Sequence, residues 1–194
     1  MIIPMVSIGG KRSQNMAGSI LGRQAFGALL ALTVQEPLTP EPLFLDFTGV
    51  EIATASYLRE SVLHFRDAVR RQRSNLYPVV ANAKEQVIEE LTLLIQANRG
   101  VLMTCSLDAQ GVPSRAILLG ELEPMQKLTF ELVNQIGETD ASELMRDYNA
   151  GKSVKQTAWN NRLSALAELG LVFEISQGRT KRYRRLFEGG VYGN

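Results

Sequence analysis

Residues that build disulfide or metal frameworks are nearly missing from this chain of 194 residues. It contains one cysteine, Cys105, and one histidine, His64, so an internal disulfide is excluded and a Cys/His metal site lacks ligands. Long apolar runs are missing as well, since no window approaches the roughly 18 uninterrupted apolar residues of a membrane span. The apolar residues of the first segment precede its basic ones, the reverse of a secretory signal. We therefore expect a cytoplasmic protein without membrane contact.

Side chains for catalysis are also scarce. Asp46 follows an apolar run, but no second carboxylate or histidine stands beside it in a readable motif. His64 adjoins the apolar face of a predicted helix, and Cys105 lies in an apolar strand as a small hydrophobic residue. No nucleophile, base and orienting group can be combined from these residues. The sequence predicts no enzyme, no catalytic residue, no cofactor and no bound metal.

Positive charge is concentrated near the end of the chain. Residues 151–187 contain eight basic and two acidic residues, a net charge of +6, whereas the whole chain has +1, which leaves −5 for the remainder. A basic segment on an otherwise acidic chain is typical of a protein in which one part meets a polyanion.

Strand and helix patterns alternate over the first part of the chain. Strands are predicted at 1–9, 43–47 and 76–83, helices at 14–34, 56–73 and 85–98, and a hairpin at 101–122. Gly100 is predicted to cap the third helix, and the arginines at the end of the second to be solvated. This order predicts an α/β domain with a mixed sheet over residues 1–123, with Pro124 at the start of a second domain, 124–194.

The second domain has a different pattern. Helices are predicted at 125–137, 140–151 and 153–170, followed by strands at 171–176 and 180–188. Asp140 and Glu143, and again Ser153 and Gln156, have the spacing of a capping box, and Gly170 that of a left-handed cap. Trp159 belongs to the inward stripe of the third helix and is predicted to pack in the core.

The stretch "LAELGLVFEISQGRTKRYRRL", residues 166–186, and the helices before it resemble the winged helix-turn-helix family over residues 125–188. The resemblance implies an α+β fold whose third helix enters the major groove of double-stranded DNA, while the hairpin contacts phosphates. The implied DNA-binding residues are Lys155, Gln156, Thr157, Asn160, Asn161, Arg162, Arg179, Lys181, Arg182 and Arg184. Such domains also serve as protein-interaction modules, and RNA is the third possible partner, so both alternatives stay open.

The stretch "LFLDFTGVEIATASYLRESV", residues 43–62, resembles the STAS domain, and more closely the STAS-like domain of bacterial regulators, over residues 1–120. In anti-sigma-factor antagonists of that family a serine at the following helix start is phosphorylated, and Ser56 falls on that position. Where those antagonists carry Asp-Ser-Ser-Gly, this chain has Thr54-Ala55-Ser56-Tyr57. We interpret Ser56 first as a helix cap, with phosphorylation as the alternative.

Together these interpretations predict a two-domain DNA-binding transcriptional regulator. Its STAS-like domain is expected to mediate dimerisation, partner binding or signal sensing, and its winged helix to bind double-stranded DNA. A homodimer is expected, formed through an exposed apolar hairpin at 101–122 or the sheet edge beside it. The alternative is a protein-interaction module that does not bind DNA, within a partner-switching or phage-defence assembly.

Overall fold

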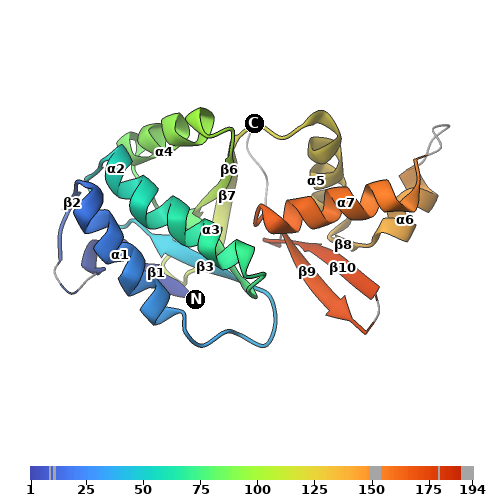
Figure 1. Cartoon of the computed structure of the whole chain (residues 1–194), viewed down its shortest axis with the longest axis horizontal. Coiled ribbons are helices and arrows are strands. Elements are labelled where there is room, and N and C mark those ends of the chain that lie inside the picture. Colours follow the sequence, from blue (N-terminus) through green and yellow to red (C-terminus); the bar gives the residue numbers. More distant parts are fainter. Residues whose placement is uncertain (9, 11, 149–153, 179, 189–194) are drawn as a thin grey trace. The chain divides into compact units, whose positions relative to one another are not determined.

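The computed structural model describes residues 1–8, 10, 12–148, 154–178 and 180–188. The chain is a mixed α/β protein, and its contacts divide it into two compact units, Met1–Glu121 and Leu122–Glu188 (Figure 1). Within the residues described, none of the helices has both the length and the apolar character needed to cross a membrane.

The first unit is built on a five-stranded sheet with the order β1-β3-β5-β6-β7. Strands β1 (Ile2–Pro4), β3 (Glu41–Asp46), β5 (Leu76–Ala81) and β6 (Val101–Leu107) run parallel to their neighbours, whereas β7 (Pro113–Gly120) is antiparallel to β6. The predicted mixed sheet is thereby confirmed. All six residues of β5 are buried, as expected for a central strand covered on both faces.

The β6–β7 hairpin does not present the exposed apolar surface that we expected. The first five residues of β6 are buried, and in the hairpin only Val112 and Ile117 are large apolar residues exposed to solvent. The register shifts between Thr104 and Ser106, as in a β-bulge, which bends a hairpin. The tip of the hairpin lies close to β1, the strand at the other end of the sheet order. A Cβ added at Gly111 in this tip would lie 2.9 Å from Ile2 Cδ1.

The helices of the first unit pack against one another. They are α1 (Ser19–Leu32), α2 (Ala55–Leu58), a π-helical turn at Arg59–Leu63, α3 (His64–Arg71) and α4 (Glu85–Ala97). The segment from α2 to α3 is one continuous helix, close to the predicted 56–73. Helix α1 starts later than predicted, because Asn15–Met16 forms strand β2 and pairs in parallel with β4 (Ile52–Ala53).

Helix α1 approaches α2 and the π-helical turn very closely at Gly22. A Cβ built on Gly22 would lie 2.8 Å from the carbonyl oxygen of Tyr57 and 2.8 Å from Glu60 Cβ. Both are far inside an ordinary van der Waals contact, and the first belongs to rigid backbone. Only glycine therefore permits this approach of the two helices.

Two predictions about residues at helix ends are wrong: the solvent exposure of Arg70 and the capping role of Gly100. Arg70 is 7% exposed rather than solvated: Nη1 donates to the carbonyl oxygens of Ser74 and Leu76 at 2.7 and 3.0 Å, and the guanidinium carbon lies 3.7 Å from the Tyr77 ring centre. Burial is tolerated because these carbonyls and the ring accommodate the charge. After α4 the left-handed residue is Arg99, with φ 49°, and not the predicted Gly100.

The second unit contains three helices and a small antiparallel sheet with the order β8-β10-β9. In chain order its elements are α5 (Pro124–Ile136), β8 (Glu138–Thr139), α6 (Ala141–Tyr148), α7 (Gln156–Glu168), β9 (Val172–Gln177) and β10 (Thr180–Arg185). The predicted helices and the hairpin are confirmed within the described residues, whereas β8 was not predicted. Gly170 has φ 78°, which confirms it as a left-handed cap. Helix α7 begins at Gln156 with Lys155 as its N-cap, so the predicted Ser153/Gln156 capping box is wrong; Ser153 itself lies outside the described residues.

Candidate nucleic-acid interface

The inner side of α7 holds the second unit together. Trp159 is 2% exposed, and Leu163 and Leu166 are fully buried, while α5 and α6 pack against the same helix. The prediction that Trp159 packs in the core is confirmed. Its indole Nε1 is buried without a hydrogen-bond partner among the described residues. The inner side thus fixes which face of α7 remains open.

The open side of α7 carries short polar side chains. Gln156, Thr157, Asn160 and Asn161 are exposed, and so is Lys155 at the N-cap position. Gln156 and Asn160, and likewise Thr157 and Asn161, are four residues apart and therefore lie next to each other on the helix surface. Amide and hydroxyl groups both donate and accept hydrogen bonds, so this surface offers the chemistry that reads the edges of bases.

Arg162 lies at the flank of this surface. Its guanidinium carbon is 5.1 Å from the Trp159 ring centre, and its Nη1 is buried without a partner among the described residues. The side chain therefore covers the tryptophan, and its charge is only partly available to an approaching molecule.

The basic residues of the hairpin differ in how they are engaged. Lys181 Nζ lies 2.7 Å from Glu174 Oε1 across the two strands. The guanidinium carbon of Arg184 lies 5.4 Å from the ring centre of Phe173, and the side chain is half-buried. Arg179, also predicted to contact DNA, lies outside the described residues.

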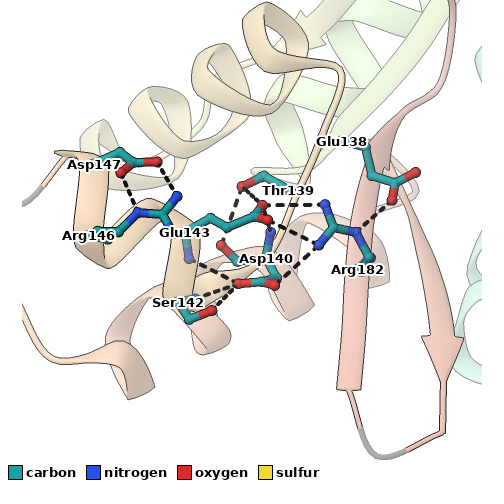
Figure 2. A network of polar contacts seen from close by, with 8 residues as sticks. All are labelled: Glu138, Thr139, Asp140, Ser142, Glu143, Arg146, Asp147 and Arg182. Atoms are coloured by element: carbon teal, nitrogen blue, oxygen red, sulfur yellow. Dashed lines mark hydrogen bonds and ion pairs between the residues drawn. The ribbon is translucent and has the colours of Figure 1, made fainter.

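Arg182 is bound by three carboxylates (Figure 2). Its Nε donates to Glu138 Oε1 at 2.6 Å, and its Nη1 lies 3.3 Å from Asp140 Oδ2 and 3.2 Å from Glu143 Oε1. The hydrogen bond to Glu138, and to a smaller extent the one to Glu143, raises the pKa of Arg182 above its ordinary value. The arginine ties β10 to β8 and to the start of α6, and phosphate contact by Arg182 stays a prediction.

The start of α6 confirms the predicted capping box. Asp140 Oδ1 accepts from the backbone N–H groups of Ser142 and Glu143 at 2.7 and 3.0 Å, and Glu143 Oε2 accepts from the N–H of Asp140 at 3.2 Å. Partial burial opposes the charge of Asp140, but hydrogen bonds from Ser142 and Glu143 and the charge of Arg182 outweigh it. The pKa of Asp140 is therefore lowered from its ordinary value.

These acidic residues change the electrostatics that the basic segment suggests. Residues 122–188 contain ten basic and nine acidic residues, so the second unit as a whole has a net charge of +1. The sequence alone gives no sign that Arg182 pairs with Glu138, Asp140 and Glu143. A two-residue strand such as β8 has no periodicity, and the acidic residues precede Arg182 by some forty positions.

In the first unit, Thr54 and not Ser56 is the helix cap. Thr54 Oγ1 accepts from the backbone N–H of Tyr57 at 3.4 Å and from that of Gly18 at 3.1 Å, so it caps α2 and also holds the start of α1. Ser56 is half-buried in the first turn, with its Oγ 3.2 Å from Thr54 Oγ1. Tyr57 is buried, and burial raises the pKa of its phenol to about 12.

Asp46, Cys105 and His64 each contact neighbouring residues of the first unit. Asp46 Oδ1 accepts from the N–H of Thr48 at 3.0 Å and from Asn82 Nδ2 at 2.9 Å, which joins the ends of β3 and β5. Burial, and to a smaller extent the nearby charge of Asp46, raises the pKa of Cys105 to about 12. The thiol therefore stays protonated and weakly nucleophilic. His64 is half exposed beside Glu60. Among the described residues no group of three His, Cys, Asp or Glu is placed to hold a metal ion.

Comparison of the chain with protein-family models and with curated proteins finds no match.

Proposed function

We propose that the protein is a DNA-binding transcriptional regulator, with a winged helix at Leu122–Glu188 and a STAS-like domain at Met1–Glu121. The observation that carries this proposal is the element order α5-β8-α6-α7-β9-β10 with the sheet order β8-β10-β9. Helix, strand, helix, helix and hairpin follow one another in this order in winged helices. Helix α7 stands in the position of the recognition helix, directly before the hairpin.

The open side of α7 supplies the base-reading groups in this proposal. The major groove of B-DNA admits an α-helix, and Asn and Gln side chains pair in bidentate fashion with adenine. Asn160 and Gln156, four residues apart on the exposed surface, take this role. Lys155 lies at the helix start, where its charge and the first backbone N–H groups favour a phosphate.

The hairpin supplies phosphate contacts of graded availability. Arg184 has no carboxylate partner among the described contacts, whereas Lys181 would exchange Glu174 for a phosphate. Arg182 acts mainly by positioning, because it fixes β10 against β8 and the start of α6. Phosphate contacts position the protein and depend on salt, while base contacts select the sequence.

The test begins with sequencing of the genomic fragments that the purified full-length protein retains. Fluorescence anisotropy then follows binding to one retained site over a salt series. Lys155→Ala and Arg184→Ala should weaken binding at every sequence and reduce the salt slope by about 1 each. Asn160→Ala should cost about 1–3 kcal/mol of discrimination at one base pair and leave the salt slope unchanged.

Arg71→Ala is the matched control, since Arg71 is an exposed arginine in the first unit. It should leave both affinity and salt slope as in the wild type. Retention of fragments at random, or equal loss in the control and the α7 variants, would refute the DNA-binding proposal.

The charge pairing of the second unit favours the alternative, a protein-interaction module in a partner-switching or phage-defence assembly. Arg182 and Lys181 already have carboxylate partners, and the second unit has a net charge of only +1. This is little charge for a surface that attracts a polyanion. No DNA affinity at low salt, together with a stoichiometric partner bound through Leu122–Glu188 and lost in Asn160→Ala, would select this function.

For the first unit we propose partner binding or signal sensing, with Ser56 as the candidate phosphorylation site. Thr54 Oγ1 already accepts two backbone N–H groups and Tyr57 is buried, whereas Ser56 is half-buried and its Oγ contacts only Thr54 Oγ1 among the recorded hydrogen bonds. Phosphate in the first turn of a helix is electrostatically favoured. Mass spectrometry of the protein from its native cells tests this, and an unmodified Ser56 in every growth phase would contradict it.

A further inference from the structure

One side of helix α1 is apolar and open to solvent. The residues that share it follow the helical spacing of 0, 1, 4, 8, 11 and 12 positions, and we call them the outer face of α1: Ile20, Leu21, Gln24, Ala28, Ala31 and Leu32. Ile20 is 66% exposed and Leu32 is 58% exposed. The adjoining side of the helix, with Gly22, Ala25 and Leu29, is buried.

The outer face carries no charge. The only charged residue of α1 is Arg23, whose Nη1 lies 3.7 Å from Glu60 Oε2 of the neighbouring π-helical turn. A surface helix ordinarily places charged residues away from its buried stripe, whereas the outer face of α1 has none. Clustered exposed apolar side chains of this kind mark an interaction surface.

A hollow adjoins the second half of the outer face. It has a volume of about 410 Å³ and is lined mainly by apolar side chains from the start of the chain and from α1: Ile3, Pro4, Ile8, Ala28, Ala31 and Leu32. The two ends of the outer face therefore differ. Ile20 and Leu21 protrude at the first turn, whereas Ala28, Ala31, Leu32 and the hollow lie toward the last.

This arrangement is complementary to itself. Ile20 and Leu32 are twelve residues, or about 18 Å, apart along the helix. If two α1 helices pack antiparallel about a two-fold axis, the first turn of each lies over the last turn of the other. Ile20 and Leu21 of one copy then enter the hollow of its partner, and the same contact forms twice, as in an isologous interface.

The lack of charge on the outer face also limits which partner can cover it. A charged partner segment would bury its charge against the outer face without a counter-charge, which is costly. The outer face of a second copy brings no charge, and its Gln24 stays near the axis, where Gly27 has open space that permits close approach. We propose that two copies of this chain form a dimer through the outer faces of α1, antiparallel about a two-fold axis.

The first test measures the mass in solution without DNA, by light scattering after size exclusion over a range of protein concentrations. The wild type should have twice the 21.5 kDa of the chain. Ile20→Glu should be monomeric, because each copy would bury a carboxylate in the hollow of its partner. It should remain folded, since Ile20 is exposed and a glutamate in the first turn suits the helix dipole.

Leu93→Glu is the matched control. Leu93 is 64% exposed on α4 of the same unit, close to the value for Ile20, and it should leave the dimer intact. The double variant Ile20→Glu/Leu32→Lys tests the antiparallel geometry. The two substituted positions are too far apart along the helix for the new charges to pair within one chain, so recovery of the dimer requires pairing across the two-fold axis.

Three results would overturn the proposal: a monomeric wild type at about 100 µM, a dimeric Ile20→Glu, or dissociation by Leu93→Glu as well. A double variant that stays monomeric would overturn the antiparallel arrangement. A wild type that is monomeric but binds an apolar dye in the hollow, with binding lost in Ala31→Arg, would assign the hollow to a small ligand instead. Because no DNA is present, these outcomes are independent of the proposed regulator function.

Discussion

Helices α1 and α7 are of similar length and each buries one side, yet their open sides have opposite chemistry. The outer face of α1 is apolar except for Gln24 and has no charge, while the open side of α7 carries amides, a hydroxyl and a lysine. Their starts differ too: Thr54 accepts from the N–H of Gly18 before α1, whereas no side chain caps α7 at Lys155. An apolar side suits a permanent protein contact, and a polar one suits hydrogen-bonded recognition that is reversible.

The largest expected effect concerns the buried side of α1. Gly22→Ala should lower the free energy of unfolding by about 2 kcal/mol, because its Cβ would meet the Tyr57 carbonyl at 2.8 Å. Gly27→Ala in the same helix meets nothing within 4 Å and should stabilise by about 0.5–1 kcal/mol. Urea unfolding followed by circular dichroism measures both, and effects of the same sign would contradict this packing.

The start of α1 gives the next largest effect. Thr54→Ala should cost about 1–2 kcal/mol, since the N–H groups of Gly18 and Tyr57 both lose their acceptor. Ser56→Ala should change the free energy of unfolding by less than about 0.5 kcal/mol, because Ser56 Oγ contacts only Thr54 Oγ1 among the recorded hydrogen bonds. Equal losses in the two variants would restore Ser56 as a cap.

The start of α7 should respond in the opposite direction. Lys155→Ser supplies the missing cap and should stabilise the second unit by about 1 kcal/mol while it weakens DNA binding. Trp159, the only tryptophan, lies in α7, so its fluorescence reports the unfolding of this unit. Lys155→Ala, which adds no cap, is the control, and a gain in both variants would show that the lysine itself is unfavourable.

The smallest effect concerns the acidic side of the second unit, and depends on pH. The lowered pKa of Asp140 in the folded state stabilises the unit above the ordinary carboxyl pKa of about 4, and this stabilisation is lost as the pH falls through the folded pKa. Asp140→Asn keeps a good capping residue and should flatten the decline in stability below about pH 4. Trp159 fluorescence in acid titrations checks this, with Glu131→Gln, an exposed carboxyl of α5 in the same unit, as the matched variant.

The long elements were predictable because their signal is local. The apolar spacing of α4 and α7, the apolar run of β5 and the Asp140/Glu143 box each depend on a few neighbouring residues. The short pairs β2–β4 and β8–β10 were missed, since their partners lie dozens of residues apart and neither β2 nor β8 is longer than two residues. Arg70 was misplaced for a related reason, because its acceptors become available only after the chain turns back at Ser74.

The sequence by itself determined the mixed α/β class, the inward stripe of α7 with Trp159, and the capping box of α6, because periodicity and short-range hydrogen bonds are encoded within one or two turns. Only the tertiary structure decided which charges and hydroxyls remain available. Folding brings Glu138, Asp140 and Glu143 to Arg182, gives the cap of α2 to Thr54, and leaves the outer face of α1 uncovered. Electrostatic pairing and burial depend on distance in space, which the order of residues along a chain does not contain.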